Sequence, residues 1–295
     1  MCKYRNKGVM MAMIVAATGC QAASADNLAK LLGAASRDGA YIAPAAREVE
    51  QAEALFQRCF DQCNDAAARH GWRQLGFEMM ETEHGGRPLL VIRESLNARQ
   101  GRGFFAFFPK SVSTTALQAP HSFKDENTRE ILLHLLAEGD FRAAAWNTVP
   151  RQYELDGMKV DADMAHLKAT YFLAFSRAFA RRFGAGKLVQ LHGFAQEKRR
   201  SESGASAEMV ISSGSRTQTP AVLETGGCLK RAELGEVRIY PTEIHELGAT
   251  TNSSGSALRA LGHAGFVHIE MSAPSRLSIL NDQTGRARLL RCLEK

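Results

Sequence analysis

From about residue 114 to the C-terminus, short apolar segments alternate with segments of helical periodicity. A strand, a helix and a second strand form the unit from which parallel sheets are built, because the helix returns the chain to the end of the sheet where it started. The alternation therefore predicts an α/β fold with a mixed, mostly parallel central sheet and helices on both faces. We expect strands at residues 89–93, 104–108, 114–119, 141–147, 187–192, 207–212, 236–240 and 265–270, and helices at 46–70, 127–138, 163–183, 219–225, 253–261 and near the C-terminus.

The first 25 residues resemble a secretory signal: basic residues, then an apolar run at 9–17 that is too short to span a membrane, then small residues. Two cleavage sites compete. Ala17-Thr-Gly-Cys20 resembles a bacterial lipobox and would make Cys20 the lipidated first residue after a signal peptide of residues 1–19. Ala23-Ser-Ala25 would instead release a soluble protein after residue 25. We expect a lipid-anchored protein that faces the periplasm of the bacterial cell envelope, with a soluble periplasmic protein as the alternative.

Beyond the signal, the chain divides into a short and a long region. Residues 20–45 are rich in Ala, Ser and Gly, which predicts a tether, and residues 46–295 are long and apolar enough for a single domain. An oxidising compartment permits disulfides. The sequence leaves their pairing open among four cysteines, Cys59, Cys63, Cys228 and Cys292.

The net charge and the absence of two common sequence motifs exclude several classes of function. The net charge of +6 is mild, and three of the basic residues lie in the first seven positions. We therefore expect no nucleic-acid partner, and contact with a membrane only through the lipid anchor. The chain has neither the G-x-S-x-G turn of serine hydrolases nor a Gly-rich phosphate loop after a strand.

Two histidines stand where predicted strands end. His121 follows the strand at 114–119 and His192 ends the strand at 187–192. Ligands of open α/β sheets bind at the carboxyl ends of the strands. Asp125 lies four residues after His121 and can face the same ion, which gives two imidazoles and a carboxylate with a position left open for water. The alternative is that His121 only ends a turn and Asp125 caps the next helix.

Glu270 lies inside an apolar strand, where a carboxylate is costly unless it is paired or functional. A hydrolytic metal site needs a carboxylate that takes a proton from water and passes it to the leaving group. We therefore expect Glu270 to be the general base. The alternative is a salt bridge between Glu270 and Arg276.

Further polar residues fall near the same predicted edge. Arg151, with Asn147, follows a strand, and its guanidinium can hold a substrate carboxylate or polarise a carbonyl, although it could equally be an ordinary loop arginine. Asp163 and His166 open the predicted long helix and can orient a metal ligand, or else be a helix-start acid and a surface histidine. Asn252 is another candidate for the substrate-binding crevice.

Three short motifs between residues 104 and 276 resemble those of the zinc-carboxypeptidase and N-formylglutamate amidohydrolase type of metallohydrolase. Pro120-His121-Ser is similar to the first ligand motif of the amidohydrolases, and Gln190-Leu-His192-Gly to the motif of the second histidine. His268-Ile-Glu270 is similar to the strand that carries the catalytic glutamate. The carboxypeptidases have His-x-x-Glu at the first motif, whereas this chain has Lys124 at the fourth position.

The resemblance implies a zinc-carboxypeptidase-like three-layer sandwich that binds one zinc ion per chain. The carboxylate ligand must come from Asp125 or Glu126, because position 124 is Lys. The implied reaction is hydrolysis of an amide or peptide bond by water that the metal and Glu270 activate, with Arg151 binding the substrate. The envelope location suggests small peptides or amides, including cell-wall fragments, as substrates.

Two other functions are compatible with the same residues. A periplasmic binding or scaffolding lipoprotein could keep the fold without catalysis, and the altered spacing after His121 favours this alternative. A metal-dependent phosphoesterase could use the same ligands. The sequence does not determine the oligomeric state.

Overall fold

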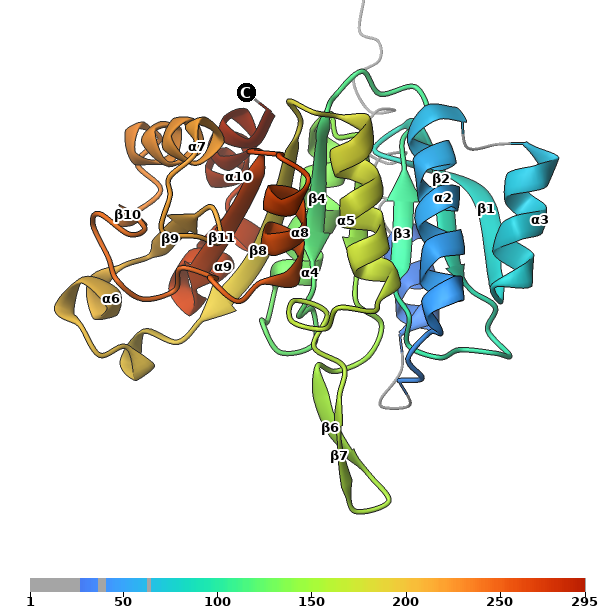
Figure 1. The fold of residues 1–295 in the computed structure, drawn as a ribbon. Helices are drawn as coiled ribbons and strands as arrows, with labels where there is room; N and C mark the ends of the chain where they lie inside the picture. Colours follow the sequence, from blue (N-terminus) through green and yellow to red (C-terminus); the bar gives the residue numbers. More distant parts are fainter. Residues whose placement is uncertain (1–26, 37–40, 63–64, 295) are drawn as a thin grey trace, which may run out of the picture.

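The computed structural model describes residues 27–36, 41–62 and 65–294, and the predicted signal, its cleavage sites and Cys20 lie outside them. Within these residues the fold is built around a nine-stranded sheet in the order β1-β2-β3-β5-β4-β8-β11-β9-β10 (Figure 1). The strands are β1 Phe77–His84, β2 Arg87–Glu94, β3 Phe104–Phe107, β4 Thr115–Ala119, β5 Ala143–Trp146, β8 Lys187–Phe194, β9 Met209–Ser212, β10 Val237–Ile239 and β11 Phe266–Ser272.

The centre of the sheet is parallel. β5, β4, β8 and β11 run in one direction, whereas β1, β2 and β3 pair antiparallel on one side and β9 pairs antiparallel with β11 on the other. The central strands are buried on both faces, as is usual for parallel strands. The predicted mixed α/β sheet is confirmed.

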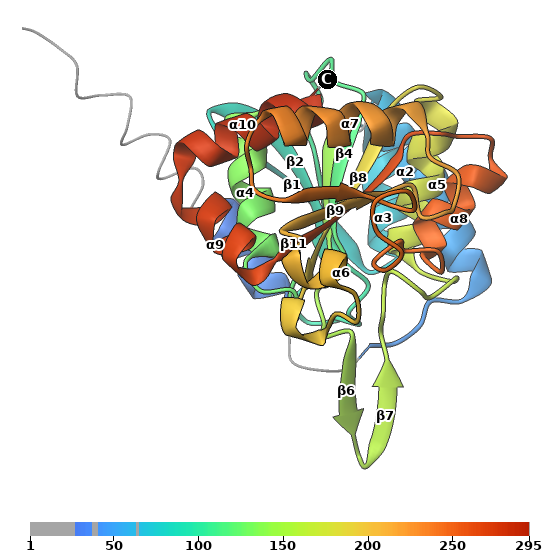
Figure 2. The same cartoon turned by 90° about the vertical axis from the view of Figure 1, so that its left-hand side faces the viewer.

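Helices cover both faces and form two apolar cores (Figure 2). Successive strand residues point to opposite faces, so Leu117 joins the core under α4, α7 and α10 while Ala116 joins the core under α2, α5 and α8. This is the predicted arrangement of helix, sheet and helix. The helices are α2 Ala46–Gln62, α3 Ala66–Gln74, α4 Thr128–Glu138, α5 Tyr171–Arg182, α6 Glu202–Ser206, α7 Pro220–Arg231, α8 Ser253–Ala260, α9 Ala273–Asn281 and α10 Gln283–Glu294.

The tether expected over residues 20–45 does not hold for residues 27–35, which are helical. Leu28, Leu32 and Ala35 recur at helical spacing and are buried in the core beside α4. The leucines at helical spacing give the segment an apolar face that the core buries and that an extended tether would leave in water.

The predicted helix over 163–183 begins later than expected, at Tyr171. The Thr170 hydroxyl accepts a hydrogen bond from Leu173 N at 3.0 Å and caps α5. Asp163 instead lies in a turn, where its own side chain accepts a hydrogen bond from Ala165 N at 3.0 Å. Competition between such side-chain bonds and the helix explains the shorter element.

A hairpin that the sequence analysis did not predict projects from the carboxyl edge of the sheet (Figures 1 and 2). Its strands are β6 Gln152–Leu155 and β7 Met158–Asp161. Asp156 and Gly157 both have positive φ, as a two-residue hairpin turn requires. Both strands are mostly exposed, so the hairpin adds little to either core.

One disulfide, between Cys228 and Cys292, joins α7 to α10, and Cys59 is also disulfide-bonded. Within the described ranges, the helices are all too short or too polar to cross a bilayer.

Candidate metal centre

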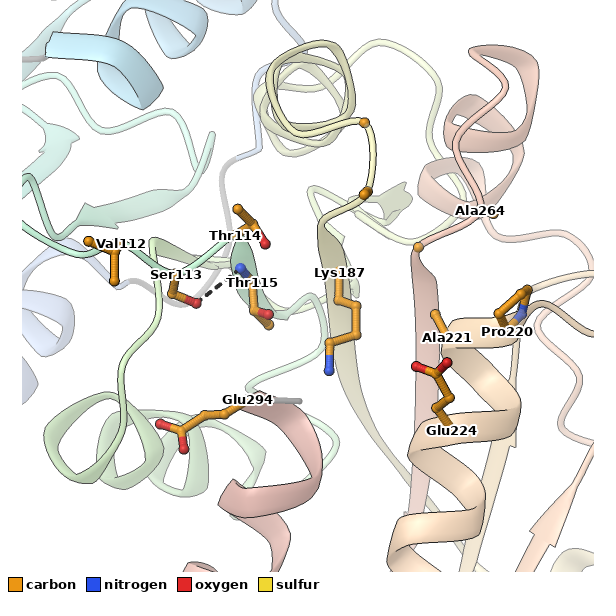
Figure 3. A pocket seen from close by; sticks show the side chains of 13 residues that line it. Val112, Ser113, Thr114, Thr115, Lys187, Pro220, Ala221, Glu224, Ala264 and Glu294 are labelled. Carbon is orange, nitrogen blue, oxygen red and sulfur yellow. Dashed lines mark hydrogen bonds between the residues drawn. The ribbon is translucent and has the colours of Figure 1, made fainter.

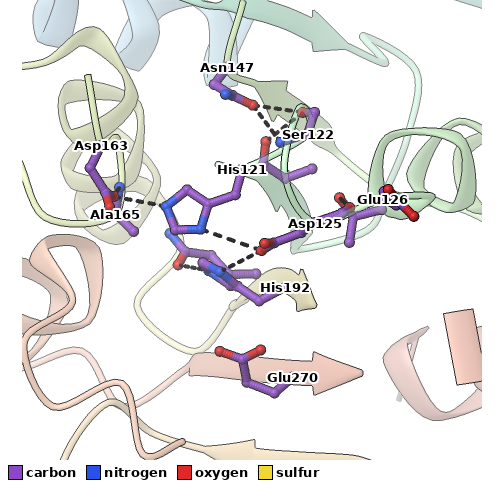
Figure 4. A network of polar contacts seen from close by, with 12 residues as sticks. His121, Ser122, Asp125, Glu126, Asn147, Asp163, Ala165, His192 and Glu270 are labelled. Carbon is purple, nitrogen blue, oxygen red and sulfur yellow. Dashed lines mark hydrogen bonds and ion pairs between the residues drawn. The ribbon is translucent and has the colours of Figure 1, made fainter. Parts of the chain in front are cut away.

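His121, His192 and Glu270 come together at the carboxyl edge of the three neighbouring strands β4, β8 and β11 (Figure 4). His192 and Glu270 are direct partners in the β8–β11 register. His121 lies just beyond the end of β4, in a turn. Parallel strands place their carboxyl ends at one edge, which is why residues 149 positions apart in the sequence share a site.

The turn after β4 aims Asp125 at both histidines. Asp125 N donates a hydrogen bond to His121 O at 2.9 Å, so the side chain folds back over the imidazole. One carboxylate oxygen, Oδ2, lies 3.4 Å from His121 Nδ1 and 3.4 Å from His192 Nδ1. The donor atoms of the three residues all lie within 4.8 Å of one another, and all three side chains are buried. Glu126, the alternative carboxylate, is exposed.

The Nε2 atom of each histidine, here called its outer nitrogen, already forms a hydrogen bond. His121 Nε2 donates to Asp163 Oδ1 at 2.8 Å, and His192 Nε2 donates to Gln190 Oε1 at 3.3 Å. These contacts fix the ring orientations and leave both Nδ1 atoms facing Asp125. Metal-binding histidines in proteins are held in the same way, so the donor set fits a divalent cation.

The charges of the site favour a cation between the carboxylates. Burial would lower the pKa of His121, but its hydrogen bonds with Asp125 and Asp163 outweigh burial and raise this pKa to about 9. Hydrogen bonds with the histidines overcome the opposite effect of burial on the two acids and hold the pKa of Asp125 and of Asp163 below its usual range. The site therefore stabilises positive charge on His121, whereas burial lowers the pKa of His192 and keeps that ring neutral.

Glu270 has a different environment. Its Oε1 lies 3.7 Å from His268 Nε2, and its Oε2 is buried without a hydrogen-bond partner among the described residues. Burial, and then the charge of Asp125, raise the pKa of Glu270 to about 8. Arg276 donates to the backbone carbonyls of Glu126 and Met271 instead of forming the alternative salt bridge with Glu270.

His268 is a neighbour of the site that sequence reasoning did not select as a candidate. Its ring lies 4.4 Å from that of His192, centroid to centroid, and both residues form a second potential donor set with Glu270. The spacing offered a signal, because residues two apart in a strand point to the same face. Burial lowers the pKa of His268 well below its usual value, which keeps the ring neutral.

A buried polar network extends from His192 beneath α5 and α8. Gln190 Oε1 also accepts a hydrogen bond from Asn252 Nδ2 at 2.7 Å, and Gln190 Nε2 donates to Gln118 Oε1 at 2.7 Å. Gln118 Nε2 in turn donates to Ser176 Oγ on α5 at 3.0 Å. A network in which each amide is satisfied holds its members rigidly. The predicted Asn252 thus supports His192 from behind, and it also caps α8.

The remaining predicted residues fall into distinct places. Asn147 Oδ1 accepts hydrogen bonds from the N and Oγ of Ser122, so it supports the turn of His121 rather than opening into a crevice. His166 Nδ1 lies 3.1 Å from Asp163 Oδ1. Arg151 stands at the base of the β6–β7 hairpin, and its Nε is buried with no hydrogen-bond partner in the described part of the chain.

A pocket of about 390 Å³ lies at the opposite edge of the sheet, at the amino ends of β4 and β8 (Figure 3). Lys187 points into it with Glu224 and Glu294 nearby. It is separated from the histidines by the length of the strands and is not part of the metal centre.

Several solved structures resemble this chain at low similarity. A bacteriophage poly-γ-glutamate hydrolase has 9% identity and a TM-score of 0.38, and the match covers 62% of this chain and 83% of that one. N-formylglutamate amidohydrolase from Ralstonia eutropha has 13% identity and a TM-score of 0.38, with 66% and 94% covered. A proposed metallopeptidase from Shewanella amazonensis has 11% identity and a TM-score of 0.35, with 78% and 94% covered.

No protein-family model matches the chain, and no curated protein matches it. The solved structures include the type of protein that the motifs around His121, His192 and Glu270 resemble. Similarity of this size does not transfer an activity. The function therefore rests on the geometry of the chain's own site.

Proposed function

We propose that this protein is a zinc-dependent hydrolase of amide or peptide bonds in the bacterial cell envelope. One observation carries the proposal: the Nδ1 atoms of His121 and His192 both lie 3.4 Å from one oxygen of Asp125, while their outer nitrogens are occupied. Two imidazoles and a carboxylate are a common zinc donor set that leaves a coordination position open.

His121, Asp125 and His192 would hold the ion, which supplies the polarisation of a carbonyl and the acidification of water that amide hydrolysis requires. Glu270 faces the same edge from the neighbouring strand. Its carboxylate takes a proton from water and delivers it to the leaving nitrogen, and a pKa of about 8 suits a group that must both accept and release a proton near neutral pH.

Arg151 is assigned to the substrate. Its Nε, at the base of the β6–β7 hairpin, is buried with no hydrogen-bond partner among the described residues, and a guanidinium can bind a carboxylate with two parallel hydrogen bonds. Small peptides or amides with a free carboxylate are therefore the proposed substrates, and cell-wall fragments meet this description. The signal-like N-terminus, with lipidation at Cys20 or cleavage after residue 25, supports the envelope location.

Metal analysis tests the proposal. Purified wild-type protein that has been offered zinc should contain about one zinc ion per chain, and a His192→Ala variant should contain none because it lacks one of three ligands. His70→Ala, which removes an exposed histidine on α3, is the matched control and should retain zinc. Wild-type protein without zinc after this treatment would refute the hydrolase and leave a binding lipoprotein as the better explanation.

A further inference from the structure

A second pocket, of about 540 Å³, lies between α5 and α8, which pack against each other (Figure 1). Its walls come from four segments, one of which is the loop before α8 with Thr250 and Thr251. The loop before α5 contributes His166 and Lys168, α5 contributes Arg177, and α8 contributes Ser253 and Ser256. The pocket is thus built from elements on the same face of the sheet as the metal centre.

The pocket has the charge of an anion site. None of the described residues that line it is acidic, whereas Lys168 and Arg177 are both cations. Glu53 lies 3.7 Å from Arg177 but makes a closer contact of 3.0 Å with Arg181, so it offsets the charge of Arg177 only in part. The amino end of α8, where the helix dipole is positive, adds to the field.

Ser253 provides an independent sign of a ligand. This residue is only 7% exposed, lines the pocket, and has a hydroxyl that is buried with no hydrogen-bond partner in the described structure. A buried hydroxyl is normally paired, because it loses its water without compensation otherwise. An acceptor oxygen in the pocket would satisfy it, and oxygen acceptors are also what Lys168 and Arg177 bind.

We propose that the α5–α8 pocket binds an oxyanion, the carboxylate or phosphate group of a small ligand, through Lys168, Arg177 and the Ser253 hydroxyl. His166 lines this pocket and also contacts Asp163, a neighbour of the candidate metal centre. Its Nε2 lies 3.1 Å from Thr251 Oγ1, which lines the pocket, and its Nδ1 lies 3.1 Å from Asp163 Oδ1, the partner of His121. Only the His166 side chain would therefore lie between a ligand in the pocket and Asp163, the residue that orients His121.

Calorimetric titration of metal-free, full-length protein with inorganic phosphate, and separately with succinate, tests the proposal. At least one ion should bind, and Lys168→Gln and Ser253→Ala should each weaken binding about tenfold, which is the loss of one charge-assisted or buried hydrogen bond. The stronger of the two ions identifies whether the natural group is a phosphate or a carboxylate.

Two controls separate this site from others. Lys159→Gln removes a lysine of the exposed hairpin and should leave binding unchanged. His192→Ala should also leave it unchanged, so the result does not depend on the hydrolase proposal. Absence of binding by either ion, binding indifferent to both Lys168→Gln and Ser253→Ala, or binding lost in His192→Ala would each overturn the proposal. Lys168 is exposed, so its variant stays informative if Ser253→Ala fails to fold.

Discussion

At the scale of single residues, Asp163 has the closest contact with His121 of the proposed metal centre. It accepts a hydrogen bond from His121 Nε2 at 2.8 Å and also contacts His166. A carboxylate in this position fixes the ring and makes the opposite nitrogen a better donor to a metal.

We expect Asp163→Asn to fold normally and to bind zinc about 10- to 100-fold more weakly than the wild type. Competition with a chromophoric chelator measures this affinity. Asp156→Asn, at the tip of the hairpin where Asn tolerates a positive φ, is the control and should match the wild type. Equal zinc affinity in Asp163→Asn and the wild type would show that the contact does not orient His121.

Glu270 predicts a pH dependence of the metal-free protein. The pKa of Glu270 is about 8 in the folded protein and 4.5 in the unfolded chain. The folded protein therefore holds the carboxyl proton of Glu270 more tightly. The resulting stabilisation is complete below pH 4.5 and is lost as the pH rises through 8. Relative to Glu270→Gln, the wild type should lose about 1 kcal/mol of unfolding free energy per pH unit across this interval.

Urea unfolding of both proteins at pH 5, 7 and 9, with a chelator present, checks this expectation. The titration of His121 and the other groups occurs in both proteins and largely cancels in the difference. Parallel stability profiles would mean that Glu270 is not buried as a neutral acid.

The Glu270→Gln variant should also retain zinc, while its rate of amide hydrolysis falls about 10²- to 10⁴-fold, as expected for loss of a general base.

At the scale of elements, the N-cap of α5 fixes where this helix begins, directly after the turn that contacts His121. Thr170 caps this helix through Leu173 N, and the preceding turn carries Asp163 and His166. Thr170→Ala should cost about 0.5–2 kcal/mol of stability, and Thr170→Ser should restore most of it because the hydroxyl remains. Thermal unfolding of the wild type and the two variants measures these losses. An equal loss of stability in Thr170→Ser and Thr170→Ala would show that the methyl group, not the hydroxyl, stabilises the helix.

The sequence predicted the elements that carry strong periodicity and missed those that depend on partners. The strands ending near His121, His192 and Glu270 were found because their apolar runs stop at polar residues. β1 was missed because its exposed residues alternate with partly buried ones at the edge of the sheet, which leaves a weak pattern. The Asp156-Gly157 turn was a readable hairpin signal that the flanking polar residues obscured.

The same limit applies to the site. The positions of His121, Asp125 and His192 follow from strand ends, but the contacts that orient them do not. Gln118 and Gln190 are 72 positions apart and become neighbours only through the register of β4 with β8. Strand order across a sheet is a tertiary property, and a single sequence without covarying positions does not encode it locally.

At the scale of the whole molecule, the helix over residues 27–35 belongs to the fold. Leu32 is 1% exposed and is part of the core shared with α4 and α10, whereas Leu31 is only partly buried. A buried leucine truncated to alanine loses both its transfer free energy and the contacts around the cavity that remains. We therefore expect Leu32→Ala to cost about 2–5 kcal/mol, and Leu31→Ala clearly less.

Urea unfolding of the two variants and the wild type measures these losses, and zinc content in the folded state should be unchanged in all three because the segment packs on the face opposite His192. A Leu32→Ala protein as stable as the wild type would show that the helix does not stabilise the domain, and would return residues 27–35 to the role of a tether. A large loss would show that residue 32 belongs to the folded domain, which would then begin well before the predicted start at residue 46. An anchored protein would then have a shorter span between Cys20 and its domain, and hence between the membrane and its metal centre.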